Sequence, residues 1–215
     1  MKRTVLMVMD MQRDFCDRKG VFARNGFRVD AIEAIVPRIR RVMRECRRRR
    51  IPIVASKLTV LTDLEGKAMG LGHLAHLRPF LAKAGFRGGT PGHAIIPQLP
   101  RPDYEFRKWG YSAMYQTELE KLLRALRAET VVFTGIATNG VVEGTARDAS
   151  MREYEVVTLS DCVAGYNPAL HEASLKNLAN IGTVITSEEF LQRLRPARPG
   201  RRARPAAARG RRTSR

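Results

Sequence analysis

The sequence predicts a single three-layer αβα domain with a mostly parallel sheet and helices on both faces. Apolar runs of strand length alternate with helix-length amphipathic segments over residues 4–194, which is the pattern of a parallel sheet. The first run is almost wholly apolar, as in strands that are covered on both sides. Several of these runs end in polar or small residues, and open α/β sheets bind ligands at that edge.

The first elements follow from local patterns. Residues 4–9, TVLMVM, predict a strand that Asp10 ends. Because the apolar run stops so early and no small-residue cleavage site follows, we expect a core strand and not a signal peptide. Residues 30–49 predict an amphipathic helix with Asp30 as its N-cap. Residues 51–57, IPIVASK, predict a second strand.

The middle of the chain is the least regular part. Residues 58–103 are rich in Gly, Pro and His, and they predict only one helix, near residues 74–84. Residues 104–108 then predict a short strand that places Lys108 at its end. Residues 115–126 predict an amphipathic helix because their leucines recur on one side.

The segment of residues 130–149, TVVFTGIATNGVVEGTARDA, predicts a strand, a turn and a helix in direct succession. Its β-branched and apolar start predicts a buried strand, Gly135 breaks it, and a helix follows. Such a turn presents backbone N–H groups and the positive end of a helix dipole to a ligand. The remaining elements are a strand at 154–160, a helix at 168–180, a strand at 182–186 and a helix at 187–194.

The net charge of +18 is distributed unevenly along the chain. Nine arginines and no acidic residue lie in residues 195–215, so half of the excess belongs to this Arg/Pro/Ala-rich segment. We therefore expect residues 1–194 to form the domain and residues 195–215 to be a disordered tail. Weak nonspecific polyanion binding by the tail is one expected consequence. The arginines of residues 38–50 are interpreted as the solvated face of a helix.

The residue pattern disfavours a cofactor-binding protein, a membrane protein and a disulfide-bonded protein. The three cysteines, Cys16, Cys46 and Cys162, are widely spaced, which indicates free thiols and a cytoplasmic protein. No apolar run reaches the roughly 18 residues of a membrane-spanning helix. No glycine-rich phosphate loop and no histidine cluster with carboxylates at ligand spacing occur, so we expect neither a dinucleotide nor a metal.

Three polar features fall at predicted strand ends: Asp10, Lys108 and the turn at 135–141. We expect them to lie together, because the carboxyl ends of parallel strands share one edge of a sheet. A carboxylate and an ammonium in a partly dry pocket can hold each other charged or exchange a proton with a substrate. The alternative interpretation is an ordinary surface ion pair.

These residues resemble the isochorismatase-like hydrolases, or cysteine hydrolase superfamily, over about residues 4–194. This group includes nicotinamidases, N-carbamoylsarcosine amidase and ureidoacrylate amidohydrolases. The matching pieces, in order, are Asp10-Met11-Gln12 with Asp14-Phe15, Gly89-Thr90-Pro91-Gly92, Lys108 with Tyr111-Ser112-Ala113, Gly135-Ile136-Ala137-Thr138-Asn139 with Val142-Glu143, and Ser160-Asp161. The resemblance implies an isochorismatase-like, Rossmann-type fold and a homo-oligomer, either a dimer or a tetramer.

The resemblance also implies a departure at the nucleophile. Amidases of the group use an Asp, Lys and Cys triad, to which Asp10, Lys108 and position 141 correspond, but position 141 is a valine. Valine cannot attack a carbonyl group. Isochorismatases also lack the cysteine, and for them an acid such as Asp10 and a water suffice. A cis peptide bond is expected to enter this position, between Gly140 and Val141.

The leading hypothesis is a small-molecule hydrolase of this superfamily that works without a cysteine nucleophile. Asp10 would be the general acid/base, Lys108 its electrostatic partner and the backbone of 138–141 a cradle for a substrate oxygen. The substrate-binding candidates are Gln12, Phe15, Trp109, Thr138 and Gly140. The alternatives are a catalytically silent member that binds a small carboxylate or a protein partner, an amidase with an unrecognised nucleophile, and a nucleic-acid binder that acts through the tail.

Overall fold

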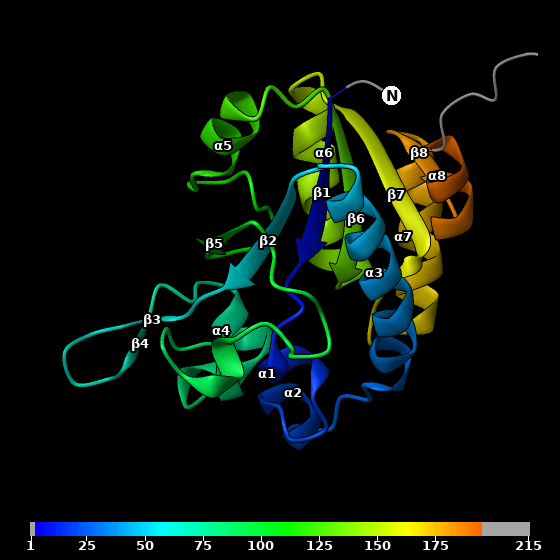
Figure 1. The fold of residues 1–215 in the computed structure, drawn as a ribbon. Coiled ribbons are helices and arrows are strands. Elements are labelled where there is room, and N and C mark those ends of the chain that lie inside the picture. Colours follow the sequence, from blue (N-terminus) through cyan, green and yellow to red (C-terminus); the bar gives the residue numbers. More distant parts are fainter. Residues whose placement is uncertain (1–2, 195–215) are drawn as a thin grey trace, which may run out of the picture.

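The computed structural model describes residues 3–194, and the predicted tail lies outside the described residues (Figure 1). The main sheet has six strands in the order β5-β2-β1-β6-β7-β8, and every neighbouring pair is parallel. Its strands are β1 (Thr4–Met9), β2 (Ile53–Leu58), β5 (Tyr104–Lys108), β6 (Thr130–Ile136), β7 (Glu155–Ala164) and β8 (Thr183–Ile185). The predicted fold class is confirmed.

Helices cover both faces of this sheet, and strand β1 shows how the two cores form. Leu6 and Val8 pack in one apolar cluster with residues of α3 (Asp30–Arg48) and α8 (Ser187–Arg193). Val5 and Met7 pack in a second cluster with residues of α5 (Leu119–Ala125), α6 (Glu143–Met151) and α7 (Pro168–Ala179). Successive side chains of a strand point to opposite faces, so a wholly apolar strand needs a helical layer on each side.

The register of β1 against β6 places the two central strand ends at one level. Met9 lies opposite Gly135, so Asp10 and the turn after β6 leave the sheet together. Gly135 has a φ of +102°, and a Cβ added there would lie 2.2 Å from the carbonyl oxygen of Met9. Only glycine allows the strands to approach this closely, and the turn is thereby held against Asp10.

Some predicted boundaries are wrong for identifiable reasons. The helix expected near 74–84 is a short α4 (Leu74–Leu77) followed by a 3₁₀ turn (Pro79–Ala82), because proline supplies no N–H to continue a helix. Asp30 is the first residue of α3 and Val29 is its N-cap. The Asp30 carboxylate instead accepts hydrogen bonds from Arg18 and Arg28.

Several short elements lie in segments without a predicted structure. They are α1 (Arg13–Cys16), α2 (Val21–Arg24), a 3₁₀ turn (Pro91–His93) and the hairpin of β3 (Leu61–Thr62) with β4 (Ala68–Met69). Helices α1, α2 and α4 gather below the carboxyl ends of the central strands in Figure 1. Within residues 3–194, no helix has the length and apolarity needed to cross a bilayer.

Candidate active site

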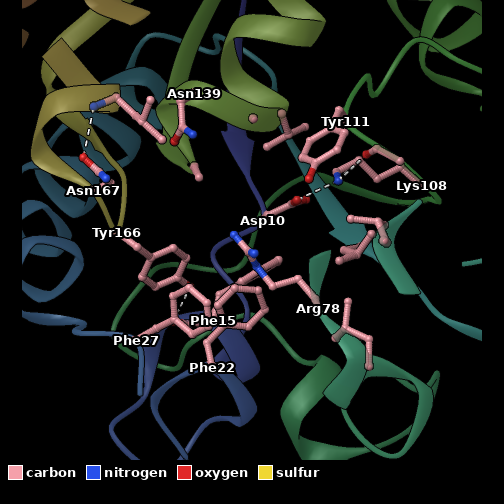
Figure 2. A pocket seen from close by; sticks show the side chains of 18 residues that line it. Asp10, Phe15, Phe22, Phe27, Arg78, Lys108, Tyr111, Asn139, Tyr166 and Asn167 are labelled. Carbon is pink, nitrogen blue, oxygen red and sulfur yellow. Dashed lines mark hydrogen bonds and ion pairs between the residues drawn. The ribbon is translucent and has the colours of Figure 1, made fainter. Parts of the chain in front are cut away.

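A cavity of about 460 Å³ opens at the carboxyl ends of the central strands (Figure 2). Its volume is in the range of small-molecule sites. The residues that line it come from the strand ends, from the short helices below them, from the loops beside these elements and from the start of α7. They are Asp10, Phe15, Phe22, Phe27, Leu58, Leu74, Arg78, Leu81, Lys108, Gly110, Tyr111, Ala137, Asn139, Gly140, Val141, Tyr166, Asn167 and Leu170.

The structure brings Asp10 and Lys108 together inside this cavity. Strand β2 lies between β1 and β5, and Lys108 reaches across its end to place Nζ 2.7 Å from Asp10 Oδ2. Both side chains are only 3% exposed, which excludes the alternative of an ordinary surface ion pair. A buried pair is costly unless its remaining polar atoms are bonded. Ser56 Oγ donates to Asp10 Oδ1 at 2.7 Å, and Lys108 Nζ donates to the Gly110 carbonyl at 2.8 Å.

The turn after β6 forms the side of the cavity opposite the aromatic residues (Figure 2). A cis peptide bond joins Ile136 to Ala137, so the expectation of a cis bond before Val141 is wrong in position. The backbone then turns through residues 138–142, with a kink at Gly140 (φ −124°, ψ −109°), and leads into α6. The N–H groups of Gly140 and Val142 both donate to the Ala137 carbonyl oxygen, at 3.0 and 3.3 Å. The amide of Gly140 is therefore engaged within the predicted oxygen cradle.

Val141 and Gly140 line the cavity, whereas Thr138 lies behind it. Val141 is buried, with its side chain in the apolar cluster of α5, α6 and α7. The Thr138 hydroxyl is 2.8 Å from His171 Nδ1 on α7 and is fully buried. This contact between Thr138 and His171 joins the turn to α7.

Of the three remaining substrate-binding candidates, one lines the cavity and two do not. Phe15 lines the cavity, but Gln12 and the half-buried Trp109 are not among the lining side chains. The Gln12 amide is buried, donates to the carbonyls of Leu58 and His93, and accepts from the Leu58 N–H. Gln12 thus joins β2 to the irregular segment and supports the site from behind.

An aromatic wall, consisting of Phe15, Phe22, Phe27 and Tyr166, forms the lower side of the cavity in Figure 2. Phe22 lies at the centre, with ring centroids 4.7 Å from Phe15, 4.9 Å from Phe27 and 5.0 Å from Tyr166. The Tyr166 hydroxyl donates to the Phe15 carbonyl at 3.0 Å, which fixes the last ring. Such a wall favours a ligand with a flat apolar body.

Sequence reasoning missed Ser56, Arg78 and most of the aromatic wall. Ser56 carries the signal that identified Asp10, because it is a polar residue near the end of an apolar strand. Phe22 and Phe27 lie in segments without a helical or strand period, and Arg78 lies within the helix predicted near 74–84, so no pattern in the sequence indicated that these residues meet at the cavity.

The three cysteines are free, buried and absent from the cavity lining. Burial raises the pKa of the Cys16 thiol well above its ordinary value, and burial raises the pKa values of Cys46 and Cys162 to about 12. They are therefore protonated at neutral pH. Among the cavity-lining side chains of residues 3–194, none is a Cys, Ser or Thr.

The buried side chain of His93, next to the site, predicts that the folded protein loses stability at mildly acidic pH. Burial and the nearby charges of Lys57 and Arg107 lower its pKa from 6.5 to about 4, while Asp14 and Glu105 partly oppose this shift. The unfolded chain therefore binds a proton before the folded chain does. The free energy of unfolding should fall as the pH drops from 6.5 towards 4, by on the order of 2 kcal/mol after allowance for solvent screening.

The check is a series of urea unfolding curves between pH 7 and 4 for the wild type and His93→Gln. Glutamine does not titrate and can keep a hydrogen bond to Thr59, whose Oγ1 is 2.8 Å from His93 Nε2. We expect a shallower pH dependence in the variant. Parallel curves for the two proteins would contradict the assignment to His93.

Comparisons with known proteins agree with this fold and identify a family. The isochorismatase domain model matches residues 4–189. Ureidoacrylate amidohydrolase RutB of Methylorubrum extorquens is 36% identical over 189 residues, which cover 81% of this chain and 75% of that protein. A crystal structure of a cysteine hydrolase from Pseudomonas syringae superposes with a TM-score of 0.78 at 26% identity, covering 89% of this chain and 92% of the other.

Two further solved structures resemble this chain over most of its length. An isochorismatase-like hydrolase from Alkaliphilus metalliredigens has a TM-score of 0.73 at 28% identity and covers 89% and 96% of the two chains. N-carbamoylsarcosine amidase from Thermoplasma acidophilum has a TM-score of 0.68 at 26% identity and covers 87% and 98%. With the family model matched over nearly the whole described domain, this chain is a hydrolase that belongs to the isochorismatase-like superfamily.

Proposed function

We propose that this hydrolase cleaves a small-molecule substrate in the cavity without a cysteine nucleophile. Asp10 is the general acid/base, and Lys108 is its electrostatic partner. The observation that carries the proposal is the buried Asp10–Lys108 ion pair in a cavity where position 141 is a valine. With no Cys, Ser or Thr among the lining side chains described, the attacking group is a water.

The reaction that suits this set of groups is protonation followed by addition of water. In a vinyl ether, Asp10 takes a proton from the Lys108 ammonium and gives it to carbon, and the resulting cation takes up water at the carbon that bears the ether oxygen. Loss of a proton, which returns to the Asp10–Lys108 pair, gives a hemiacetal or hemiketal, which separates into an alcohol and a carbonyl compound. A positioned acid contributes about 10²–10⁴-fold to such a step. The chemistry needs no protein nucleophile.

Lys108 and the turn after β6 have supporting roles in this proposal. Lys108 holds the Asp10 carboxyl group in one orientation and places a positive charge beside it. Gly140 lines the cavity without a side chain, which leaves room for a substrate oxygen at the turn.

An amidase with another nucleophile is the less favoured reading. Ureidoacrylate amidohydrolase and N-carbamoylsarcosine amidase are named for C–N bond cleavage. In this chain Cys16 is buried, and its thiol pKa is raised well above the ordinary range. The lining described has only the amine, carboxylate and phenol groups of Lys108, Asp10 and two tyrosines as further nucleophiles.

The test is a panel of amides, ureido compounds and isochorismate, assayed with the wild type and Val141→Cys. We expect the wild type to hydrolyse the vinyl ether and to leave the amides intact. Val141→Cys should gain amidase activity of at least about tenfold over the wild type, because the thiol would lie in the cavity with Asp10 and Lys108.

Val142→Cys is the matched control, because Val142 is fully buried in the apolar core and does not line the cavity. This variant places the same thiol at the next residue and should gain no amidase activity. Strong amidase activity of the wild type would contradict the proposal. Ligand binding without turnover of any member of the panel would favour the silent-member alternative. Cytoplasmic location, homo-oligomer formation and polyanion binding by residues 195–215 stay predictions.

A further inference from the structure

Arg78 is a charged cavity residue that the proposed reaction does not use. It lies between α4 and the 3₁₀ turn that begins at Pro79, inside the segment for which the sequence predicts one continuous helix. Figure 2 shows its guanidinium group turned into the cavity in the direction of Asp10. Since Asp10 and Lys108 balance each other, Arg78 gives the described lining a net charge of +1.

Two contacts hold the Arg78 side chain in this orientation. Its guanidinium carbon lies 4.9 Å from the centre of the Phe27 ring, which is a cation–π distance. Its Nη1 donates to the Leu77 carbonyl at 2.7 Å. The guanidinium is thus positioned by the aromatic wall and by its own backbone.

Neither contact neutralises the charge of Arg78. Within residues 3–194, no Asp or Glu forms an ion pair with it, although many arginines in the same part of the chain have such a partner. Arg87 differs from Arg78 in its hydrogen bonds. Its guanidinium donates to the carbonyls of Leu81, Ala82 and Gly85, so its role is structural. Arg78 has one such bond, and a guanidinium has five N–H donors.

We propose that Arg78 binds a substrate carboxylate, so that the substrate is a small carboxylic acid with a flat apolar body. The carboxylate pairs with Arg78, the body lies on the aromatic wall, and the bond to be cleaved faces Asp10. This inference rests on the proposed function for the site and adds the substrate class and a specificity-determining residue. Arginine suits this role because its planar donors bind a carboxylate through two parallel hydrogen bonds.

Arg78 could instead serve only to set the electrostatics around Asp10. The two roles predict different results. A carboxylate-binding Arg78 discriminates between an anion and a neutral molecule of the same shape. An Arg78 that acts only on Asp10 changes the pH profile of the reaction and leaves that discrimination intact.

The experiment compares cinnamate with cinnamyl alcohol, which share a flat apolar body and differ in charge. Binding of each probe to the full chain is measured by calorimetry for the wild type, Arg78→Met and Arg78→Lys. We expect the wild type to prefer cinnamate by about tenfold or more, since charge-assisted pairs are the strong hydrogen bonds. Arg78→Met should lose that preference and bind cinnamyl alcohol within about twofold of the wild type. Arg78→Lys should recover part of it.

Arg44→Met is the matched control, because Arg44 is exposed on α3 and is not among the lining residues, and its loss changes the net charge equally. It should keep the preference of the wild type. If Arg78→Met retains the preference for cinnamate, or if the wild type shows none, the inference is overturned. If Arg78→Met fails to fold, the wild type and Arg78→Lys still test whether Arg78 binds the carboxylate. An Arg78→Lys variant that binds cinnamate as tightly as the wild type excludes bidentate binding by the arginine.

These binding results do not depend on turnover. A wild type that prefers cinnamate through Arg78 but hydrolyses nothing in the substrate panel would refute the proposed function and leave the carboxylate site standing. A wild type that hydrolyses neutral substrates, with activity indifferent to Arg78→Met, would refute the carboxylate site and leave the hydrolase proposal standing.

Discussion

Asp10→Asn is expected to reduce kcat by about 10²–10⁴-fold on whichever substrate the wild type hydrolyses. Asparagine has nearly the shape of aspartate and can still accept a hydrogen bond from Ser56, which lies 2.7 Å from Asp10 Oδ1 in the wild type. It cannot give or accept the proton that the reaction moves. The measurement is steady-state kinetics on protein shown to be folded by circular dichroism at the assay temperature.

Stability has to be separated from chemistry in this experiment, because Asp10→Asn leaves the Lys108 ammonium buried without its partner. Asp14→Asn is the control. The Asp14 carboxylate is buried and accepts hydrogen bonds from the N–H groups of Val21 and Phe86, but it does not line the cavity. We expect Asp14→Asn to lose stability and to retain kcat. Full activity of folded Asp10→Asn would refute the role of Asp10 as the acid/base.

Lys108→Met is expected to lower the free energy of unfolding by about 3–5 kcal/mol. The cause is the Asp10 carboxylate, which would keep its bond from Ser56 but lose its ion-pair partner, Lys108, inside the buried site. The loss is the cost of an unpaired buried charge and exceeds the net worth of the pair itself. Urea unfolding at neutral pH measures it.

Lys57→Met provides the comparison for a more exposed pair. Lys57 Nζ lies 2.6 Å from Glu105, and the two side chains are 18% and 35% exposed. Water screens such a pair, so we expect a loss of only about 0.2–1 kcal/mol. The double variant Asp10→Asn, Lys108→Met should be more stable than Lys108→Met alone, because it contains no unpaired charge. An unchanged stability of Lys108→Met would show that Asp10 does not depend on its partner.

Much of this protein could be predicted from local patterns. Strand-length segments, most of them apolar, predicted all six strands of the main sheet, and their polar ends predicted that Asp10, Lys108 and the turn after β6 lie at one edge. This works because a strand covered on both faces must be apolar, and because parallel strands end on the same side. The sequence also showed that a valine occupies position 141, where the related amidases have a cysteine. The residue type alone shows this, because valine has no nucleophilic group.

Helix boundaries and the form of the cavity could not be predicted in the same way. Pro79 divides the helix expected at 74–84, and the helices α1 and α2 show no period long enough to detect. The cavity is built by the packing of such segments on one another: Phe22 from α2, Tyr166 from the loop after β7 and Arg78 from the loop after α4.

The sequence by itself thus determined the layers, the sheet and the meeting of Asp10 with Lys108, because these depend on the residue types along each strand and on the edge at which parallel strands end. The tertiary structure alone decided which side chains surround that pair. It brought Ser56 onto Asp10, the aromatic wall beneath it and Arg78 over Phe27. These contacts join segments far apart along the chain, and nonlocal packing leaves no periodic trace in the sequence from which it could be read.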